Sequence, residues 1–141
     1  MSMTMHVDIV SLEAKIFAGL ANIVYATGKV GEMGIYPGHA PLISSLKPGY
    51  IRVVLPEKKE QLFYVSGGLI EVQSFTISIL ADTVVRADDI DEAKAKAAQE
   101  KAEKRLKEKL SDIEYSEVMA NLAQAAAQLQ TLQKLRKKYN I

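Results

Sequence analysis

The turn-forming residues of this chain are confined to its N-terminal part. All eight glycines and all four prolines lie at or before Gly68, whereas residues 88–141 are rich in alanine, leucine, lysine, glutamate and glutamine. Those 54 residues also carry 21 of the 35 charged side chains. Because glycine and proline disfavour helix interiors and mark turns, the two parts cannot be the same kind of structure. We place the boundary near Ala87 and predict a β-rich part followed by a helical part.

Length, charge and cysteine content exclude several classes of protein. A chain of 141 residues favours one small core, or one core with an appendage. The net charge of +1 lacks the strong field that draws a protein to nucleic acid or to an anionic membrane. The absence of cysteine excludes disulfides and thiolate nucleophiles. The first residues, MSMTMHVDIV, lack the basic and apolar pattern of a signal peptide, and no run is apolar enough to suggest a membrane span. We therefore expect a soluble, cytoplasmic chain that binds no nucleic acid and meets a membrane only through a complex.

Six short stretches rich in β-branched and aromatic residues occupy the N-terminal part. Turn residues separate them at the regular spacing that is typical of a sandwich or flattened barrel. No helix alternates with the strands, which excludes a doubly wound nucleotide fold. We therefore predict an antiparallel β-sandwich over residues 1–87. The stretches are MHVDIV, NIVYAT, YIRVVL, QLFYVS, LIEVQ and TISILA.

Two helix starts are visible in the C-terminal part. Asp89 with Glu92, and Ser111 with Glu114, have the spacing of a capping box, in which side chains and backbone amides at a helix start bond to each other. We predict that two antiparallel helices form a hairpin within residues 88–141, which makes the fold class α+β. The predicted helices span about 90–110 and 112–138.

Apolar residues form facing stripes on the two predicted helices. The spacing of 3 and 4 on the second helix is a heptad seam, and alanines on the first helix allow two helices to approach closely. A hairpin of two helices has little core of its own, so it must pack against the sandwich or a partner. The predicted seam is Tyr115, Val118, Leu122, Ala125, Leu129 and Leu132, and the predicted stripe is Ile90, Ala93, Ala97, Ala98, Ala102 and Leu106.

No pattern in the chain indicates catalysis. His6 and His39 are the two histidines, and neither lies in a nucleophile motif such as G-x-S-x-G. The glycine-rich stretch GKVGEMG lacks the Gly-Lys-Ser/Thr end of a phosphate-binding loop. Glu32 and His39 could ligate a metal, but two ligands seven residues apart fall short of the three or four that a site needs. We predict neither an enzyme nor a metal site.

The end of the second predicted helix is strongly basic. Lys134, Arg136, Lys137 and Lys138 complement the helix dipole and are compatible with a solvated helix end. Residues 118–133, just before them, carry no charge, which is unusual for a helix in water. The pattern is compatible both with a solvated end and with a surface that binds a partner.

Four segments of the chain resemble one protein family. The chain closely resembles the epsilon subunit of bacterial F-type ATP synthase in MHVDIVSLEAKIFAG, GEMGIYPGHAPLI, VSGGLIEVQ and ILADTVVRADDIDEA, and then in a charged helical hairpin. The resemblance implies a non-catalytic rotor subunit of the central stalk, which couples ion transport through the membrane ring to ATP synthesis and restrains ATP hydrolysis. It also implies a peripheral location at the cytoplasmic face of the bacterial cell membrane.

The resemblance implies roles for particular residues. The sandwich would bind the gamma shaft and rest on the ring of c subunits through a loop at residues 31–42, where Glu32 and His39 match the family's acid and imidazole. The hairpin would regulate hydrolysis, with its second helix reaching the alpha/beta catalytic head. The residues implied for this inhibitory helix are Val118, Met119, Leu122, Leu129, Lys134, Arg136, Lys137 and Lys138.

One departure from the family pattern concerns nucleotide. Family members that bind ATP between the two helices resemble Ile/Leu-Asp-x-x-Arg-Ala, whereas this chain has IDEAKA at residues 90–95. Because Lys94 lacks the planar fork that fits phosphate, the resemblance implies at most weak ATP binding, through Asp91 and Lys94, and no other cofactor. A stand-alone nucleotide-sensing module is the alternative function. A folded or an extended hairpin, and proton or sodium coupling, are all compatible with the sequence.

Overall fold

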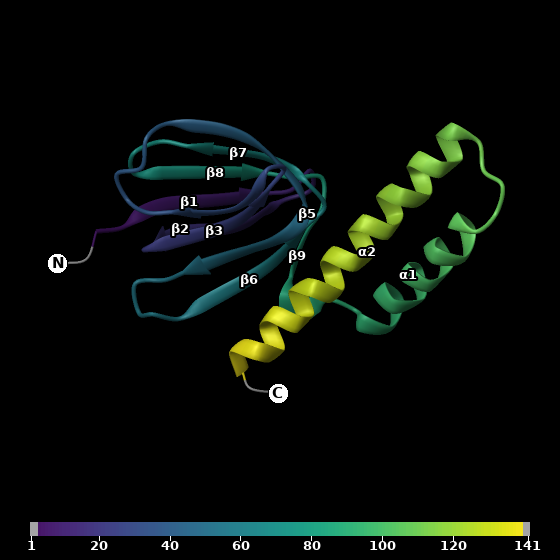
Figure 1. The fold of residues 1–141 in the computed structure, drawn as a ribbon. Helices are drawn as coiled ribbons and strands as arrows, with labels where there is room; N and C mark the ends of the chain where they lie inside the picture. The colour runs from purple at the N-terminus through teal and green to yellow at the C-terminus, as the bar shows by residue number, and fades with distance from the viewer. Residues whose placement is uncertain (1–2, 140–141) are drawn as a thin grey trace.

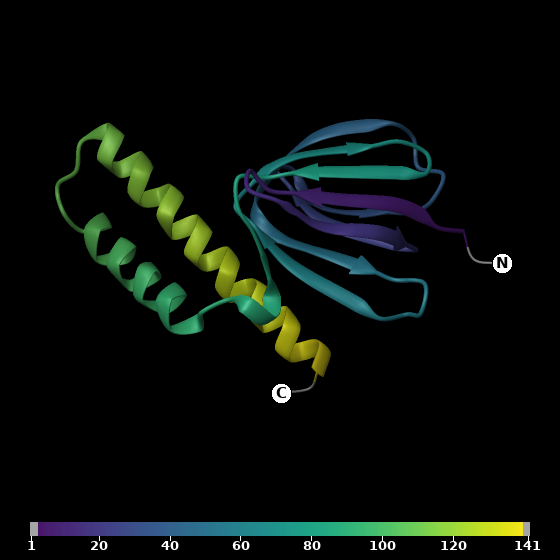
Figure 2. The same cartoon turned by 180° about the vertical axis from the view of Figure 1, so that it is seen from behind.

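A β-sandwich forms one end of the molecule and a hairpin of two helices the other (Figure 1, Figure 2). The computed structural model describes residues 3–139, without the side chains of residues 138 and 139. The predicted α+β fold is confirmed. The strands are β1 (Met5–Val10), β2 (Lys15–Ala21), β3 (Ile23–Gly28), β4 (Gly31–Ile35), β5 (Leu42–Val54), β6 (Glu60–Val65), β7 (Gly68–Val72), β8 (Thr76–Leu80) and β9 (Val84–Arg86). A 3-10 helix, η1 (Ala87–Asp89), leads into α1 (Glu92–Leu106) and α2 (Asp112–Tyr139).

The long strand β5 joins the two layers of the sandwich. One of its edges pairs with β3, whereas the other pairs first with β7 and then with β6. The sheet therefore divides along β5 into a layer of β2, β1, β8 and β7 and a layer of β4, β3, β5, β6 and β9. The strand pairs in the described part of the chain are antiparallel except for β1 with β8, which run parallel. A parallel pair needs a connection much longer than a hairpin, and 65 residues separate these two strands.

Alternate side chains of both layers fill the space between them. This is the arrangement expected of a sandwich, because successive side chains on a strand point to opposite faces. The apolar residues that point inward from the strands make one continuous core. Its largest fully buried members are Met5, Ile9, Ile35, Ile51, Phe63, Ile70, Ile77 and Ile79.

The outer face of β5 and β6 is buried as well. Tyr50 on β5 is 4% exposed and its register partner Tyr64 on β6 is 1% exposed, although neither belongs to the interior core. Helix α2 contacts both strands, and in Figure 1 and Figure 2 it runs across them with α1 on its far side. The hairpin is thus folded down against the sandwich.

Helix α2 has two buried faces. Val118, Ala125 and Leu132 recur every seven residues and are buried, and the first two line a cavity shared with α1. Ala127 and Thr131 are also buried. They lie about two turns and one turn before Lys134, whose ammonium group contacts the ring of Tyr50 on β5. The hydroxyl of Thr131 donates to the Ala127 carbonyl at 2.7 Å. Burial accounts for the absence of charge at these five positions, whereas other uncharged residues of the segment, such as Met119 and Gln124, are exposed.

Two details of the predicted helix packing are wrong. Tyr115, the first member of the predicted seam, is 52% exposed. On α1 the buried alanines are Ala95 and Ala102, whereas Ala93 and Ala97 of the predicted stripe are exposed. The rotation of α1 about its axis is set by its contact with α2, and alanines that are equally small and equally favourable to helix cannot specify that rotation.

Candidate functional site

Backbone hydrogen bonds hold the loop between β4 and β5. The Gly38 amide donates to the Ser74 carbonyl at 2.6 Å, and the His39 amide donates to the Tyr36 carbonyl at 3.2 Å. Nδ1 of His39 lies 2.6 Å from the Ala40 carbonyl oxygen. A carbonyl oxygen can only accept, so this contact is a hydrogen bond when Nδ1 is the donor. The contact holds the orientation of the His39 ring in the loop.

Glu32 lies at the other end of β4. It is exposed and pairs with Thr27 in the β3–β4 ladder. At a rise of about 3.3 Å per residue, the strand places about 10 Å between Glu32 and Ile35, and His39 lies beyond Ile35. The structure does not bring Glu32 and His39 together. The predicted single loop over residues 31–42 is wrong at its start, because residues 31–35 form β4.

Glu32 has a neighbour that the sequence analysis missed. Its carboxylate lies near the side chain of Tyr50. Burial of Tyr50 and this nearby carboxylate raise its pKa to about 12, because both disfavour the phenolate. Thr27 lies in the same row and its hydroxyl donates to the Tyr50 carbonyl at 3.2 Å. No sequence pattern links Glu32 with Tyr50, since only the pairing of three strands brings them together.

Basic side chains at the end of α2 contact both neighbouring parts of the molecule. Nζ of Lys134 lies 5.3 Å from the centre of the Tyr50 ring. Arg136 forms an ion pair with Glu92 at the start of α1. Lys137 is exposed and lines a hollow of about 270 Å³ beside β5 and β6. The basic end therefore helps to close the hairpin and to dock it on the sheet.

The other residues implied for an inhibitory helix differ in exposure. Val118 is buried, and Leu122 and Leu129 are half-buried. Met119 is 39% exposed. The side chain of Lys138 lies outside the described residues. In the folded-down hairpin these residues therefore do not form one continuous exposed surface.

The tip of the hairpin is capped as the sequence predicts. The Glu114 amide donates to Ser111 Oγ at 3.2 Å, and the Ser111 amide donates to the Glu114 carboxylate at 3.4 Å. Arg105 at the end of α1 donates to the same carboxylate at 3.2 Å. The hydroxyl and amide of Ser111, followed by Arg105, hold the pKa of Glu114 below its ordinary value. This box links the end of α1 to the start of α2.

The cap of α1 differs from the predicted pair of Asp89 and Glu92. The side chain of Asp91 accepts a hydrogen bond from the Lys94 amide at 3.1 Å, so Asp91 is the N-cap residue. Asp89 belongs to η1. The 3-10 turn uses residues 87–89 and delays the helix start by two residues.

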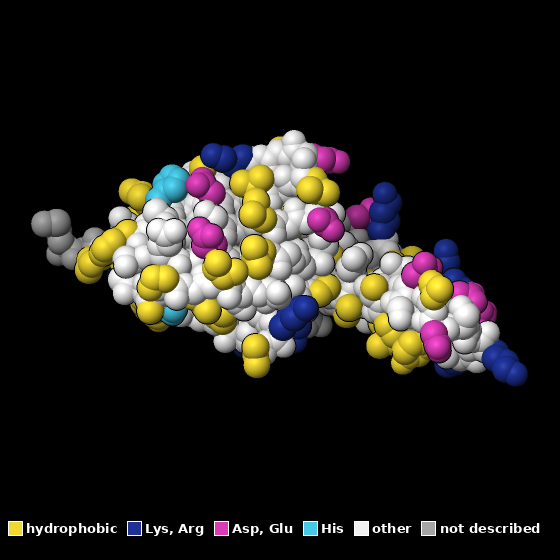
Figure 3. All heavy atoms as spheres, turned by 90° about the horizontal axis from the view of Figure 1, so that it is seen from above, with side chains coloured by type: hydrophobic (Ala, Val, Ile, Leu, Met, Phe, Trp, Pro, Cys, Tyr) yellow, Lys and Arg dark blue, Asp and Glu magenta, His cyan; other side chains and the backbone are white. Residues whose placement is uncertain are grey.

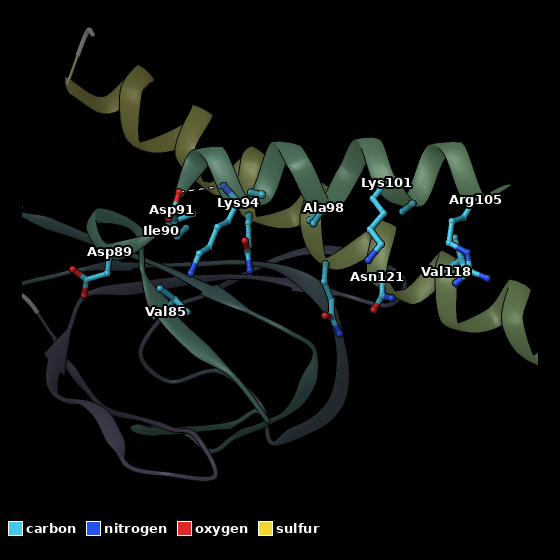
Figure 4. Close-up of a pocket in the computed structure, with 15 residues that line it drawn as sticks. Val85, Asp89, Ile90, Asp91, Lys94, Ala98, Lys101, Arg105, Val118 and Asn121 are labelled. Carbon is cyan, nitrogen blue, oxygen red and sulfur yellow. Dashed lines mark hydrogen bonds between the residues drawn. The ribbon is translucent and has the colours of Figure 1, made fainter. Parts of the chain in front are cut away.

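A cavity of about 560 Å³ lies between α1, α2 and β9 (Figure 4). Asp91, Lys94, Lys101 and Arg105 on α1 line it, together with amide side chains of α2 such as Asn121. Figure 4 shows the three cations projecting from one side of α1. Lys101 and Arg105 were missed by the sequence analysis, although their positions two and three turns after Lys94 place them on the same helix face.

Apolar side chains are exposed on the outer face of the other sandwich layer. Leu80 on β8 and Leu69 on β7 are register partners and are 53% and 39% exposed. Ile43 on the neighbouring strand β5 is 65% exposed; it pairs with Glu71 and so lies diagonally from Leu69. Figure 3 shows apolar side chains spread over the sandwich on the face seen from above. Such a group on adjacent strands is a candidate contact surface, unlike a single exposed side chain.

Two kinds of feature are absent from residues 3–139. Within this range no group of three or more His, Asp or Glu residues is placed to hold a metal ion. Neither α1 nor α2, as far as they are described, combines the length and the apolar character needed to cross a membrane.

Two family models match consecutive parts of the chain. The model of the ATP synthase, Delta/Epsilon chain, beta-sandwich domain matches residues 4–87, and the model of the corresponding long alpha-helix domain matches residues 88–133. The chain is also 52% identical over 138 residues to the ATP synthase epsilon chain of Nitrosococcus oceani. That alignment covers 98% of this chain and 99% of the relative.

Two solved structures contain chains of similar fold. One comes from the cryo-EM structure of the Euglena gracilis mitochondrial ATP synthase with its c-ring, with a TM-score of 0.83, 20% identity, and coverage of 92% of this chain and 81% of that chain. Another comes from the central stalk and c-ring of the Tetrahymena thermophila mitochondrial ATP synthase, with a TM-score of 0.63, 12% identity, and coverage of 93% and 98%. At these identities the likeness shows the fold alone. On the family models and the 52% identical relative, the chain belongs to the ATP synthase epsilon chain family, whose members are non-catalytic subunits.

Proposed function

We propose that the chain works as a rotor subunit of the central stalk, joining a gamma-type shaft subunit to the membrane ring of c subunits. The observation that carries this proposal is the 52% identity to an ATP synthase epsilon chain over 98% of the chain. The origin of the two chains of similar fold, in ATP synthase structures that include a c-ring and in one case a central stalk, supports it. In this role the sandwich transmits ion-driven rotation by contact rather than by chemistry.

Separate surfaces of the sandwich would serve the shaft and the ring. The exposed group of Leu80, Leu69 and Ile43 has the apolar character that a stable contact with a shaft subunit needs. Glu32 and His39 would meet polar loops of the ring at two points, one at each end of β4. We expect the chain to lie at the cytoplasmic face of the bacterial membrane as a peripheral subunit, held there only through the complex.

Copurification tests these two surfaces. Glu32→Ala combined with His39→Ala should weaken association with the ring and leave association with the shaft and the melting temperature of the isolated chain nearly unchanged. Leu69→Asp is the matched control, because it should weaken association with the shaft first. Unchanged ring association in the double variant, at unchanged folding, would show that the ring contact lies elsewhere.

The hairpin would inhibit ATP hydrolysis when its second helix leaves the sandwich. Released α2 would extend beside the shaft into the alpha/beta catalytic head. The uncharged segment 118–133 could be buried there without the cost of several kcal/mol that accompanies an unpaired buried ion. Lys134, Arg136 and Lys137 would then meet acidic residues of the head. Burial of the same segment on two faces of the folded hairpin supports this, because it shows a helix suited to dry surroundings.

Truncation tests the inhibitory role. A chain that ends at Leu110 lacks α2 and should raise ATP hydrolysis by the assembled complex, whereas shaft and ring contacts in the sandwich remain. A chain that ends at Tyr139 is the matched control and should hydrolyse ATP at the original rate. If hydrolysis is unchanged in complexes that retain the shortened subunit, the helices act as a structural brace and not as an inhibitor.

The cavity between the helices favours nucleotide sensing as a second candidate function. Lys94, Lys101 and Arg105 place three cations around about 560 Å³. The carboxylate of Asp91 already caps the helix, and α2 adds neutral amides. We therefore expect ATP to bind the isolated protein with a dissociation constant in the millimolar range or weaker, on the order of 4 kcal/mol. Micromolar binding in calorimetry, abolished by Lys94→Ala, would instead make sensing the main function.

A further inference from the structure

The side chain of Arg86 crosses the boundary between β2 and β9. In the described part of the chain β2 pairs with β1 and β9 pairs with β6, and no ladder joins β2 to β9. Arg86 is the last residue of β9. Its Nη2 atom donates to the Ile16 carbonyl of β2 at 2.8 Å, and its Nη1 atom donates to Oε1 of Gln61 on β6 at 2.9 Å. One guanidinium thus ties the end of β9 to two other strands.

An aromatic pair lies beside the same guanidinium. The central carbon of the Arg86 guanidinium is 5.3 Å from the centre of the Phe63 ring. Phe63 is buried and is the register partner of Arg86, and it meets Phe17 of β2 edge to face at a centroid distance of 5.8 Å. A planar guanidinium can donate in two directions and also stack on a ring, which a lysine ammonium cannot do. The side chain type therefore matches the place.

The chain leaves the sandwich directly after Arg86. Ala87 begins η1 and is 2% exposed, and η1 contacts both β6 and α2. The Ile90 amide closes this turn on the Ala87 carbonyl at 3.3 Å. Ile90 and Asp91 then have extended backbone angles, with ψ of 128° and 102°, before α1 begins. Residues 90–91 are thus a joint between two helical turns, with η1 on the sandwich side of it.

We propose that Arg86 is a positioning residue that fixes the point at which the chain leaves the sandwich. Because Arg86 holds β9 and η1 against β2 and β6, the hairpin turns about residues 90–91 when α2 lifts from the sheet. The exit then stays in place, and α2 can return to the same site on β5 and β6. Without the guanidinium, β9 keeps only its short ladder with β6 and opens together with α2. This inference rests on the proposed release of α2.

The alternative is that Arg86 only adds to the stability of the sandwich. Its loss would then raise hydrogen exchange in β1 and β8 as much as in β9, whether α2 is docked or released. The proposal instead makes the protection of β9 and η1 depend on Arg86 once α2 is released, because docked α2 contacts η1 in any case. The experiment therefore varies the docking of α2 and the side chain of Arg86 independently.

The test is native-state hydrogen exchange in the isolated full-length chain. Ala127→Asp puts a charge at a buried position of α2, so α2 amides should exchange about 100-fold faster. In this variant the amides of β9 and of Ile90 should stay as protected as in the original chain. Addition of Arg86→Met, which keeps an unbranched side chain beside Phe63 and removes the guanidinium, should raise their exchange about tenfold. Amides of β1 and β8 should not change.

Two further variants are made in the Ala127→Asp background. Phe17→Leu is the matched control, because it weakens the packing between β2 and β6 but keeps both hydrogen bonds of Arg86, so β9 and Ile90 should stay protected. Arg86→Lys keeps the charge and loses the planar fork, so it should raise the same amides by a smaller factor. It replaces Arg86→Met if that variant does not fold. Dispersed amide spectra of each variant establish that it is folded.

Four results would overturn the proposal. Faster exchange of β9 and Ile90 in Ala127→Asp alone would place the hinge inside β9. Unchanged exchange after Arg86→Met is added would show that Arg86 does not hold the exit. An equal effect of Phe17→Leu would assign the hold to the packing of β2 on β6, and equal acceleration of β1 and β8 would leave Arg86 a role in general stability only.

The inhibitory role of α2 is judged by a separate measurement. In the assembled complex, Ala127→Asp should lower ATP hydrolysis if released α2 is inhibitory. Unchanged hydrolysis would reject the inhibitory role and leave the anchoring of β9, measured by exchange in the isolated chain, intact.

Discussion

Leu132 is a place where the packing of α2 against α1 can be weakened without changing the sandwich. Its side chain is 8% exposed and lies on the face of α2 that carries Val118 and Ala125. Truncation of a buried leucine to alanine costs about 2–5 kcal/mol, and the low end applies where the site can collapse. Leu132 lies near the end of a helix at the edge of the molecule, so we expect about 2 kcal/mol for Leu132→Ala.

This loss should appear as a shift between the docked and the released hairpin. At about 1.4 kcal/mol per tenfold change, a loss of about 2 kcal/mol raises the released population about 30-fold. A helix without its packing surface is marginal in water, so the amide protons of α2 should exchange about 30-fold faster in native-state hydrogen exchange. Amides of β1 and β8 should not change, because their protection reports the sandwich.

The control is Met119→Ala, a similar truncation on the same helix at a side chain that is 39% exposed. It should have a clearly smaller effect on exchange. Equal acceleration of the α2 and β1 amides in Leu132→Ala would refute the reasoning, because it would mean that α2 opens only when the whole chain unfolds. In the assembled complex, the same variant should lower ATP hydrolysis if released α2 is inhibitory.

Four further substitutions test the local geometry and the two shifted pKa values. Gly49→Ala should lower the free energy of unfolding by about 1–3 kcal/mol in denaturant titration, because its new Cβ would meet Thr27; an unchanged midpoint would contradict the close approach. The pKa of Tyr50, raised from 10.0 to about 12, means that the folded chain keeps a proton that the unfolded chain releases. Tyr50 therefore contributes fully to the free energy of unfolding below pH 10, and this contribution of up to about 3 kcal/mol is lost as the pH rises toward 12. Tyr50→Phe should remove this dependence of stability on alkaline pH. The lowered pKa of Glu114 acts in the opposite direction. Glu114 stabilises the folded chain above the ordinary carboxyl pKa, and this stabilisation is lost as the pH falls through the lower pKa that Glu114 has in the folded chain. Glu114→Gln should flatten this acid dependence in thermal melts, and Ser111→Ala should cost about 1 kcal/mol through the lost cap.

Local patterns predicted the parts of the structure that depend on neighbours in the chain. The regular turn spacing predicted the sandwich, and the spacing of Ser111 and Glu114 predicted the start of α2, because a capping box needs only four consecutive residues. The same reasoning failed at Asp89, where a 3-10 turn precedes the helix and Asp91 becomes the cap. Two acids close together satisfy the same local pattern, and the path of the chain out of β9 selects between them.

At the candidate site, too, local patterns predicted some features and the tertiary structure decided others. The uncharged segment 118–133 and the basic residues after it were visible in the sequence, and they were compatible with a solvated helix end or with a surface that binds a partner. Which surface that helix covers was decided by the tertiary structure, since docking depends on side chains of β5 and β6 far away in the chain. The cavity between the helices is a second example. The motif at residues 90–95 identified Lys94, whereas Lys101 and Arg105 are recognised as lining residues only once α2 packs beside α1.

The sequence by itself therefore determined the fold class, the family and the chemical character of each segment, because composition, periodicity and motifs act over a few residues. The tertiary structure alone decided that Glu32 and His39 lie at opposite ends of a strand and that Lys134 lies over the ring of Tyr50. Those relations depend on strand register and on the rotation of packed helices. Both are set by the summed contacts of residues that are distant in sequence, and a register change of one residue would turn Tyr50 to the other face of the sheet.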